Sequence, residues 1–252
     1  SHLTVKADIA AIGIGASGTE GDLIKIDPLN YEGTGASSGQ SVKGTASAGV
    51  QGVRIFKTFP TVAKIAVPST TLTVGQVDLY RFSVTANSTG NVGLYQFSFN
   101  LATSSASTAN GTTTISGATL YAYNDAGFSS PVSNGAFTNG LLATVATPAG
   151  GKNAFNFGSA LQVPAGTTLY FRLVATVAQT AGTTGSSGSV STYISGDTGA
   201  TVLGNATALA ASSTVWSANA TSTSVAASND WTNGYLVTGL PTLGTDIVTL
   251  SK

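Results

Sequence analysis

The stretch "QVDLYRFSVTANSTGNVGLYQFSFNLA", residues 76–102, alternates apolar and polar residues twice, on either side of a short polar segment. A period of two is typical of a β-strand, in which successive side chains point to opposite faces. The larger apolar residues fall on one face of each run: Tyr80, Phe82, Val84 and Ala86, then Tyr95, Phe97, Phe99 and Leu101. Because "NSTGN" has the composition of a turn, we expect 76–86 and 92–102 to form a β-hairpin.

The same alternation recurs along the chain, punctuated by glycine, proline and Asn-Gly pairs. Further strands are predicted at 53–59, 61–67, 118–124, 141–147, 152–158, 166–178, 188–196, 214–220 and 235–241. The strand at 166–178 echoes that at 76–86, and each carries one outward arginine among hydroxyl side chains, Arg172 and Arg81. No long segment keeps helical spacing without glycine or β-branched interruption. The pattern predicts an all-β fold, an antiparallel β-sandwich of the immunoglobulin-like or jelly-roll-like kind.

The N-terminal part differs from the rest in charge. Residues 1–64 hold 11 of the 20 charged residues, so we divide the chain into an N-terminal segment, 1–50, and a sandwich domain, 51–252. The segment opens with "LTVKADIAA", whose alternation predicts a half-buried strand; its apolar face consists of Leu3, Val5, Ala7, Ile9 and Ala11. We therefore expect a sandwich with an N-terminal β-strand extension or a partial module.

Composition narrows the classes of function. Hydrophobic residues make up 42% of the 252 residues, enough for a core, but charged residues only 8%, against about 25% in ordinary domains. The net charge of zero predicts no nucleic-acid partner and removes the repulsion that keeps copies apart. No apolar run is long enough for membrane insertion.

The absence of sulfur-containing residues favours a location outside the cell. The chain has no cysteine and no methionine, so it offers oxidants little to attack. It also lacks an initiating methionine, which we interpret as removal of a signal peptide, although trimming would leave the same beginning. We expect an extracellular, cell-surface protein.

The inventory of reactive side chains is poor. The single histidine, His2, lies at the extreme N-terminus, and without it a catalytic triad or a His/Cys metal site cannot be assembled. The ten acids are dispersed, and their densest group, around Glu20 and Asp22, lacks the spacing of a calcium loop. We therefore expect no enzyme, no cofactor and no metal.

Two sets of residues are candidates for contact with sugars. Aromatic side chains at Trp216, Trp231 and Tyr235 would form a stacking platform if they shared an exposed face, although aromatics in a sandwich more often belong to the core. Four asparagines begin an Asn-x-Ser/Thr tripeptide and are candidate glycan attachment sites: Asn87, Asn110, Asn205 and Asn219.

Residues 53–101, with "DWTNGYLVTGLP" at 230–241, resemble a known group of proteins. Three short motifs carry the resemblance: Arg54, Phe56, Lys57 and Pro60; "LYRFSVTA" at 79–86; and "LYQFSF" at 94–99. They are similar to β-sandwich modules of large Ser/Thr/Gly/Ala-rich secreted surface proteins of candidate-phyla (ultra-small) bacteria. The resemblance implies a surface-layer, adhesin or fibre subunit, and none of its motifs is catalytic. Such modules occur in series, so 1–50 would be the end of a further module.

Together these observations predict a non-enzymatic structural protein, a subunit of a cell-surface filament or surface layer. A strand with an apolar face and too few partners can be added to a sheet of the next copy, and such a head-to-tail contact does not close. The expected partner is then the chain itself. Alternatively, 1–50 folds back on its own sandwich in a monomeric module, or the chain is an adhesin or carbohydrate-binding module whose partners are surface glycans or host cells.

Overall fold

The structure, a computed structural model, describes residues 6–25, 30–45, 52–104, 111–180, 182, 187–241 and 246–252. The chain divides into two compact units, Ser1–Lys57 and Thr58–Lys252. This division lies a little after the boundary placed at 50 and 51 from the charge distribution. Most of the predicted strand at 53–59 is irregular: only Val53–Arg54 (β4) is paired, with Leu23–Ile24 (β1) inside the first unit.

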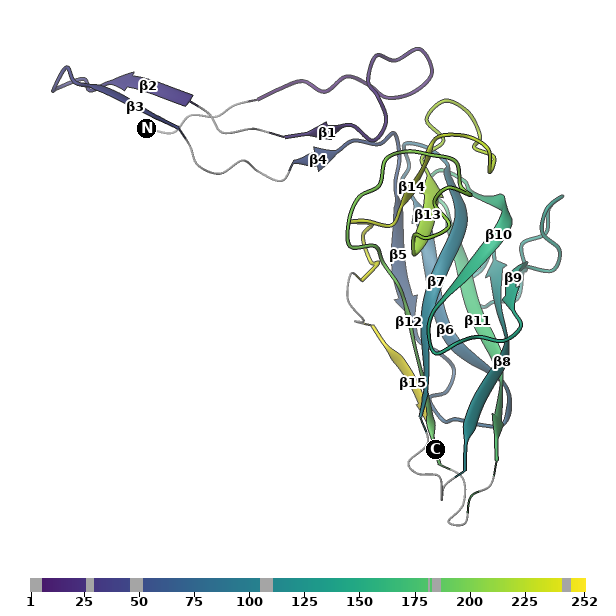
Figure 1. Cartoon of the computed structure of the whole chain (residues 1–252). Coiled ribbons are helices and arrows are strands. Elements are labelled where there is room, and N and C mark those ends of the chain that lie inside the picture. The colour runs from purple at the N-terminus through teal and green to yellow at the C-terminus, as the bar shows by residue number, and fades with distance from the viewer. Residues whose placement is uncertain are drawn as a thin grey trace. The chain divides into compact units, whose positions relative to one another are not determined.

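The second unit is an antiparallel β-sandwich, as predicted (Figure 1). The five-stranded sheet has the order β5-β6-β11-β8-β9, formed by Pro60–Ile65, Gly75–Ala86, Thr168–Gln179, Thr113–Tyr123 and Leu141–Val145. The six-stranded sheet has the order β14-β13-β7-β12-β15, formed by Trp231–Asn233, Thr214–Ser217, Val92–Ser104, Ser189–Ile194 and Val248–Ser251. Its sixth strand, β10 (Gly151–Val163), pairs with β7.

Aromatic side chains fill the space between the two sheets. Phe82 of β6 stacks on Phe171 of β11, with ring centroids 4.7 Å apart, and meets Phe97 of β7 edge-on at 5.1 Å. Tyr80 packs against Phe99 across the interface in a tilted arrangement, with ring centroids 5.8 Å apart. All five side chains are almost completely buried. The apolar faces predicted from the alternation of β6 and β7 therefore do form the core, with Tyr95 as the exception described below.

The predicted hairpin between 76–86 and 92–102 is wrong. β6 pairs with β5 and β11, whereas β7 pairs with β10, β12 and β13, so the segment 87–91 crosses from one sheet to the other. Each strand buries a row of large rings. In a hairpin these rows would lie side by side, whereas in two sheets they face one another. Thr58 holds the crossing segment, because its hydroxyl donates to the carbonyl of Gly90 at 2.9 Å.

β7 is the central strand of its sheet and is buried on both faces. β10 runs along one edge, while β12 and β13 share the other edge end to end. At Tyr95 the register shifts against both β10 and β13, and the ring packs against Trp231 rather than beside Phe97. Behind it lies a second apolar cluster, made of Tyr95, Ala206, Leu209, Val215 and Trp231. Gln96 anchors the segment that carries Ala206 and Leu209, because its side-chain amide donates to the carbonyls of Ala210 and Ser212.

The C-terminal part departs further from expectation. The predicted strand at 235–241 is a series of turns, with Leu236 at φ 59° and Gly239 at φ 84°. Two unpredicted strands replace it, β14 and β15, and β15 lines the edge of β12. Within the described part of the chain, no helix is long and apolar enough to cross a membrane.

The described residues of the first unit form strands without a buried core. Besides β1 and β4 it contains Asn30–Thr34 (β2) and Ser41–Thr45 (β3), which form a two-stranded ribbon. Cross-strand contacts hold this ribbon: the Tyr31 ring lies over Gly44, and Lys43 pairs with Glu32 at 2.9 Å. No residue described between 6 and 57 is buried.

In the described part of the predicted strand at 3–11, residues 6–11, no residue pairs with another strand, and only the carbonyl of Ala11 accepts a local hydrogen bond, from Gly18. Leu3 and Val5 lie outside the described residues. Residues 6–11 belong to no strand, and Ala7, Ile9 and Ala11 are exposed. The expectation of a half-buried strand is therefore wrong for residues 6–11 of the single chain.

We expect Phe82→Ala to destabilise the sandwich by about 3–5 kcal/mol, because it removes a ring that four core aromatics contact and leaves a cavity. Chemical denaturation followed by tryptophan fluorescence measures the change. The control is Phe59→Ala, at a ring that is 47% exposed, and it should cost less than about 1 kcal/mol. Equal losses in the two variants would contradict the assignment of Phe82 to the centre of the core.

Candidate functional site

The strongest concentration of charge in the sandwich lies on the outer face of the five-stranded sheet. The chain contains three arginines, and two of them, Arg81 of β6 and Arg172 of β11, are directly opposite one another in the register. Two like charges in this position repel each other. Asp78 offsets the repulsion by binding both guanidinium groups.

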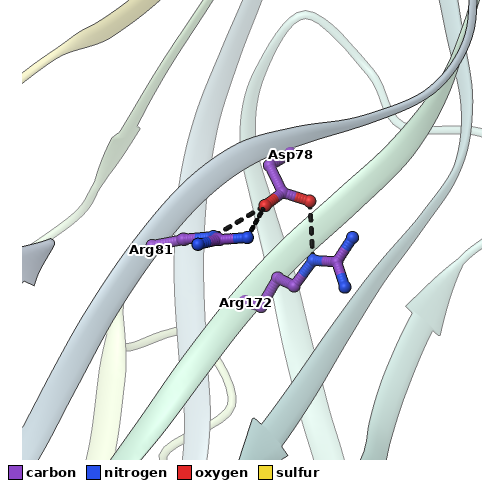
Figure 2. Close-up of polar contacts among 3 residues, drawn as sticks. All are labelled: Asp78, Arg81 and Arg172. Atoms are coloured by element: carbon purple, nitrogen blue, oxygen red, sulfur yellow. Dashed lines mark hydrogen bonds and ion pairs between the residues drawn. The ribbon is translucent and has the colours of Figure 1, made fainter. Parts of the chain in front are cut away.

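Figure 2 shows the Asp78 carboxylate between the two arginines. Its Oδ2 accepts from Nε of Arg81 at 2.6 Å and contacts Nη2 of the same side chain at 2.5 Å. Its Oδ1 accepts from Nε of Arg172 at 2.6 Å. The carboxylate is only 7% exposed, whereas the Arg81 and Arg172 side chains are 18% and 31% exposed. Asp78 is thus fully engaged, and the terminal nitrogens of Arg172 point away from it.

A β-bulge makes this arrangement. In a regular strand, residues 78 and 81 would project from opposite faces. Here Tyr80 pairs with Leu173 and Asp78 with Val174, so Leu79 is an extra residue. Leu79 is completely buried, although the alternation had placed it on the polar face with Arg81. The extra residue brings Asp78 to the same face as Arg81.

Aromatic rings surround the arginines. The Arg81 guanidinium lies over the Phe128 ring, 4.3 Å from its centroid, in a cation–π contact. Tyr123 and Tyr170 meet Phe128 edge-on at 5.4 and 6.3 Å, and Tyr121 is directly opposite Arg172 in the register. All of these rings are half-buried. We name the set the arginine–tyrosine patch; it consists of Arg81, Tyr121, Tyr123, Phe128, Tyr170 and Arg172.

A tight loop places Phe128. The Asp125 carboxylate accepts from the backbone N–H groups of Ser129 and Ser130, and from the Ser129 hydroxyl at 2.8 Å. Phe128 itself has φ 56°, a conformation that costs a bulky residue energy and that this loop imposes. The loop therefore fixes the ring on which Arg81 rests.

The surroundings of Arg172 favour its charged form. Burial works against the charge of Arg172, but hydrogen bonds and attraction from Asp78, and then from Tyr123, together outweigh it and raise the pKa of its guanidinium. The patch thus offers two permanent cations and only one carboxylate between them. Among the described residues, no three His, Cys, Asp or Glu side chains gather in a group that could hold a metal ion. The chemistry available to the patch is binding of a negative or polar group.

The predicted sugar platform is wrong. Trp231 is 0% exposed in the second apolar cluster, with its Nε1 donating to Val225, and Trp216 is buried with its Nε1 donating to Asn233. Both indoles belong to the packing of the six-stranded sheet, where no sugar ring can reach them. Tyr235 is half-buried on the adjacent turn.

The candidate glycan sites have different outcomes. Asn219 is buried, and its amide nitrogen donates to Gln162 and Asn91, so it cannot carry a glycan in the folded sandwich. Asn87 and Asn205 are half-buried on loops, where their Oδ1 atoms accept from Thr89 and Ala208, and they stay predictions. Asn110 lies outside the described residues.

We expect Asp78→Asn to destabilise the sandwich by about 3 kcal/mol, because it leaves two facing, partly buried guanidinium groups without an anion. Chemical denaturation measures the loss. Arg172→Gln alone should cost less than about 1 kcal/mol, since Asp78 keeps Arg81. The double variant should be more stable than Asp78→Asn by at least about 0.5 kcal/mol. Purely additive losses would contradict the shared role of Asp78.

The Asp125 loop predicts a pH dependence. Hydrogen bonds from Ser130 and Ser129 lower the pKa of the Asp125 carboxyl below its ordinary value of 3.8. Because the folded pKa is depressed, its stabilising effect is complete above 3.8 and is lost as the pH falls through the lower folded value. Carboxyl NMR titration should place the midpoint below 3.8, and Ser129→Ala should raise it toward 3.8. An unchanged midpoint in Ser129→Ala would refute the role given to that hydroxyl.

Comparison of the chain with protein-family models, with curated proteins and with solved structures finds no match.

Proposed function

We propose that the protein is a non-enzymatic structural subunit of an extracellular filament or surface layer, and that copies join when an N-terminal strand of one is added to a sheet of the next. The observation that carries this proposal is the absence of any buried residue among those described in the first unit. A chain of that length in water requires a buried surface to stay ordered, because isolated two-stranded ribbons are at best marginally stable.

Exposed apolar side chains in the first unit support a protein partner. They come from every part of the unit that the structure describes: Ile9, Ile14, Leu23, Ile24, Tyr31, Val42 and Val53. Burial of several of them against one partner would give the contact an apolar centre. Burial against another protein would remove them from water at about 25 cal/mol for each Å².

The sandwich supports the proposal from the other side of the contact. β9 pairs with β8 and β10 pairs with β7. Within the described part of the chain neither has a hydrogen-bonded partner strand on its second edge, although β9 and β10 lie close to one another. An unpaired edge offers backbone N–H and C=O groups to an incoming strand. The zero net charge adds no repulsion between copies. The resemblance of 53–101 and 230–241 to surface-protein modules points to the same class of function.

Removing the proposed donor tests the idea. We expect the full chain to form fibres or sheets visible by electron microscopy, and a variant lacking residues 1–15 to remain monomeric with an unchanged near-ultraviolet circular dichroism spectrum. Ile9→Asp should weaken assembly because it places a charge in the buried face. The matched control is Val202→Asp, at an equally unpartnered valine on the sandwich, and it should assemble normally.

A synthetic peptide of residues 1–15 sharpens the test. Added in excess, it should occupy the acceptor edge and stop growth, while a scrambled peptide should not. Assembly of the shortened chain at the rate of the full chain would refute strand addition. A full chain that stays monomeric at high concentration would instead support the fold-back alternative.

A further inference from the structure

The two arginines of the patch differ in how their charge is used. Arg81 points two of its nitrogens at Asp78, and its flat face rests on Phe128. Arg172 gives Asp78 only its Nε, and it is the more exposed of the pair. Its two terminal nitrogens point away from the Asp78 carboxylate (Figure 2). Tyr123 is also a hydrogen-bond partner of the Arg172 side chain, so the outer part of this planar fork lies beside a tyrosine hydroxyl. Such a fork suits a carboxylate or another planar anion.

The balance of charge also favours an anion. Asp78 satisfies at most one of the two guanidinium charges, so the trio keeps one net positive charge. The acid of the nearby loop, Asp125, is held by Ser129 and Ser130 and makes no ion pair with either arginine within the described part of the chain. Because Asp78 is shared between the two guanidinium groups, a second anion beside Arg172 would stabilise the pair further.

The neighbours of Arg172 favour a sugar as the carrier of that anion. Two rows cross the sheet side by side: Tyr121, Arg172 and Arg81 form one, and Tyr123, Tyr170 and Ser83 form the next. Tyrosine offers an apolar ring and a hydroxyl together, which matches the apolar faces and hydroxyl edges of a pyranose. The rows lie on a sheet face rather than in a cavity, and such a surface accommodates an extended chain polymer.

We propose that the arginine–tyrosine patch binds an acidic polysaccharide, with Arg172 receiving the carboxylate of a uronic acid and Tyr121, Tyr123 and Tyr170 contacting the sugar rings. The tyrosines select for a sugar, and the arginine selects for its charge. This activity is separate from assembly, which uses the first unit and the sheet edges. A surface subunit with such a patch would hold a charged matrix although it is itself uncharged overall.

Calorimetric titration of the full chain with polygalacturonate tests the proposal. We expect binding that weakens as salt is raised, and no binding of neutral dextran. Arg172→Gln should bind at least about tenfold more weakly, the usual value of a charge-assisted hydrogen bond. The affinity of Arg172→Lys should lie between those of the wild type and Arg172→Gln, because an ammonium keeps the charge but not the planar fork. Tyr170→Ala should also weaken binding. Lys252→Gln, which removes one exposed positive charge elsewhere, is the control and should match the wild type.

Three results would overturn the proposal. The first is no binding of polygalacturonate by the full chain. The second is equal affinity of Arg172→Gln and Lys252→Gln, which would leave only a diffuse charge effect. The third is binding of poly-L-glutamate as tight as that of polygalacturonate, which would indicate a surface for acidic peptides. Thermal unfolding shows whether each variant is folded. If Arg172→Gln does not fold, Arg172→Lys provides the test in its place.

Discussion

The packing of Phe82 against the rings around it is the interaction on which the rest of the structure depends. Phe82 is stacked on Phe171 within its own sheet and meets Phe97 and Phe99 of the other sheet. Once these rings face one another, β6 and β7 must belong to different sheets. The outer face of β6 is then fixed as well, and with it the position of Arg81 beside Arg172. The inner face of β6 thus contributes to the core, and its outer face contributes to the arginine–tyrosine patch.

Much of the fold follows from local pattern. Period-two alternation predicts β6, β7 and β11 with almost their observed bounds, because a half-buried strand imposes that pattern on its residues. The same pattern cannot say which sheet a strand joins. A five-residue polar segment suits a hairpin and a crossing between sheets equally, and only the rings far apart in sequence decide. Short strands such as β14 lack the length for any periodicity, and Leu236 and Gly239 adopt left-handed conformations inside an apparently regular apolar run.

The candidate site was visible from the sequence only in part. The alternation identifies Arg81 and Arg172 as outward residues of two similar strands, but their pairing depends on the register between segments about ninety residues apart. Asp78 would be placed on the wrong side of its strand, because alternation cannot reveal the bulge at Leu79. For the tryptophans, residue type suggested an exposed surface where the structure has a core. Trp231 is of a type that stacks on sugars, but the segment that follows β12 covers it.

The arrangement of strands also determines how slowly the molecule must form. β6 finds β11, and β7 finds β10, only after long intervening segments have been brought into place. Because the paired residues are far apart in sequence, the contact order is high, and the entropy of closing the intervening loops is lost before the strands pair. Folding of β-sandwiches therefore falls in the range of milliseconds to seconds. The polypeptide therefore folds more slowly than a helical bundle of the same length, whose contacts are mostly local.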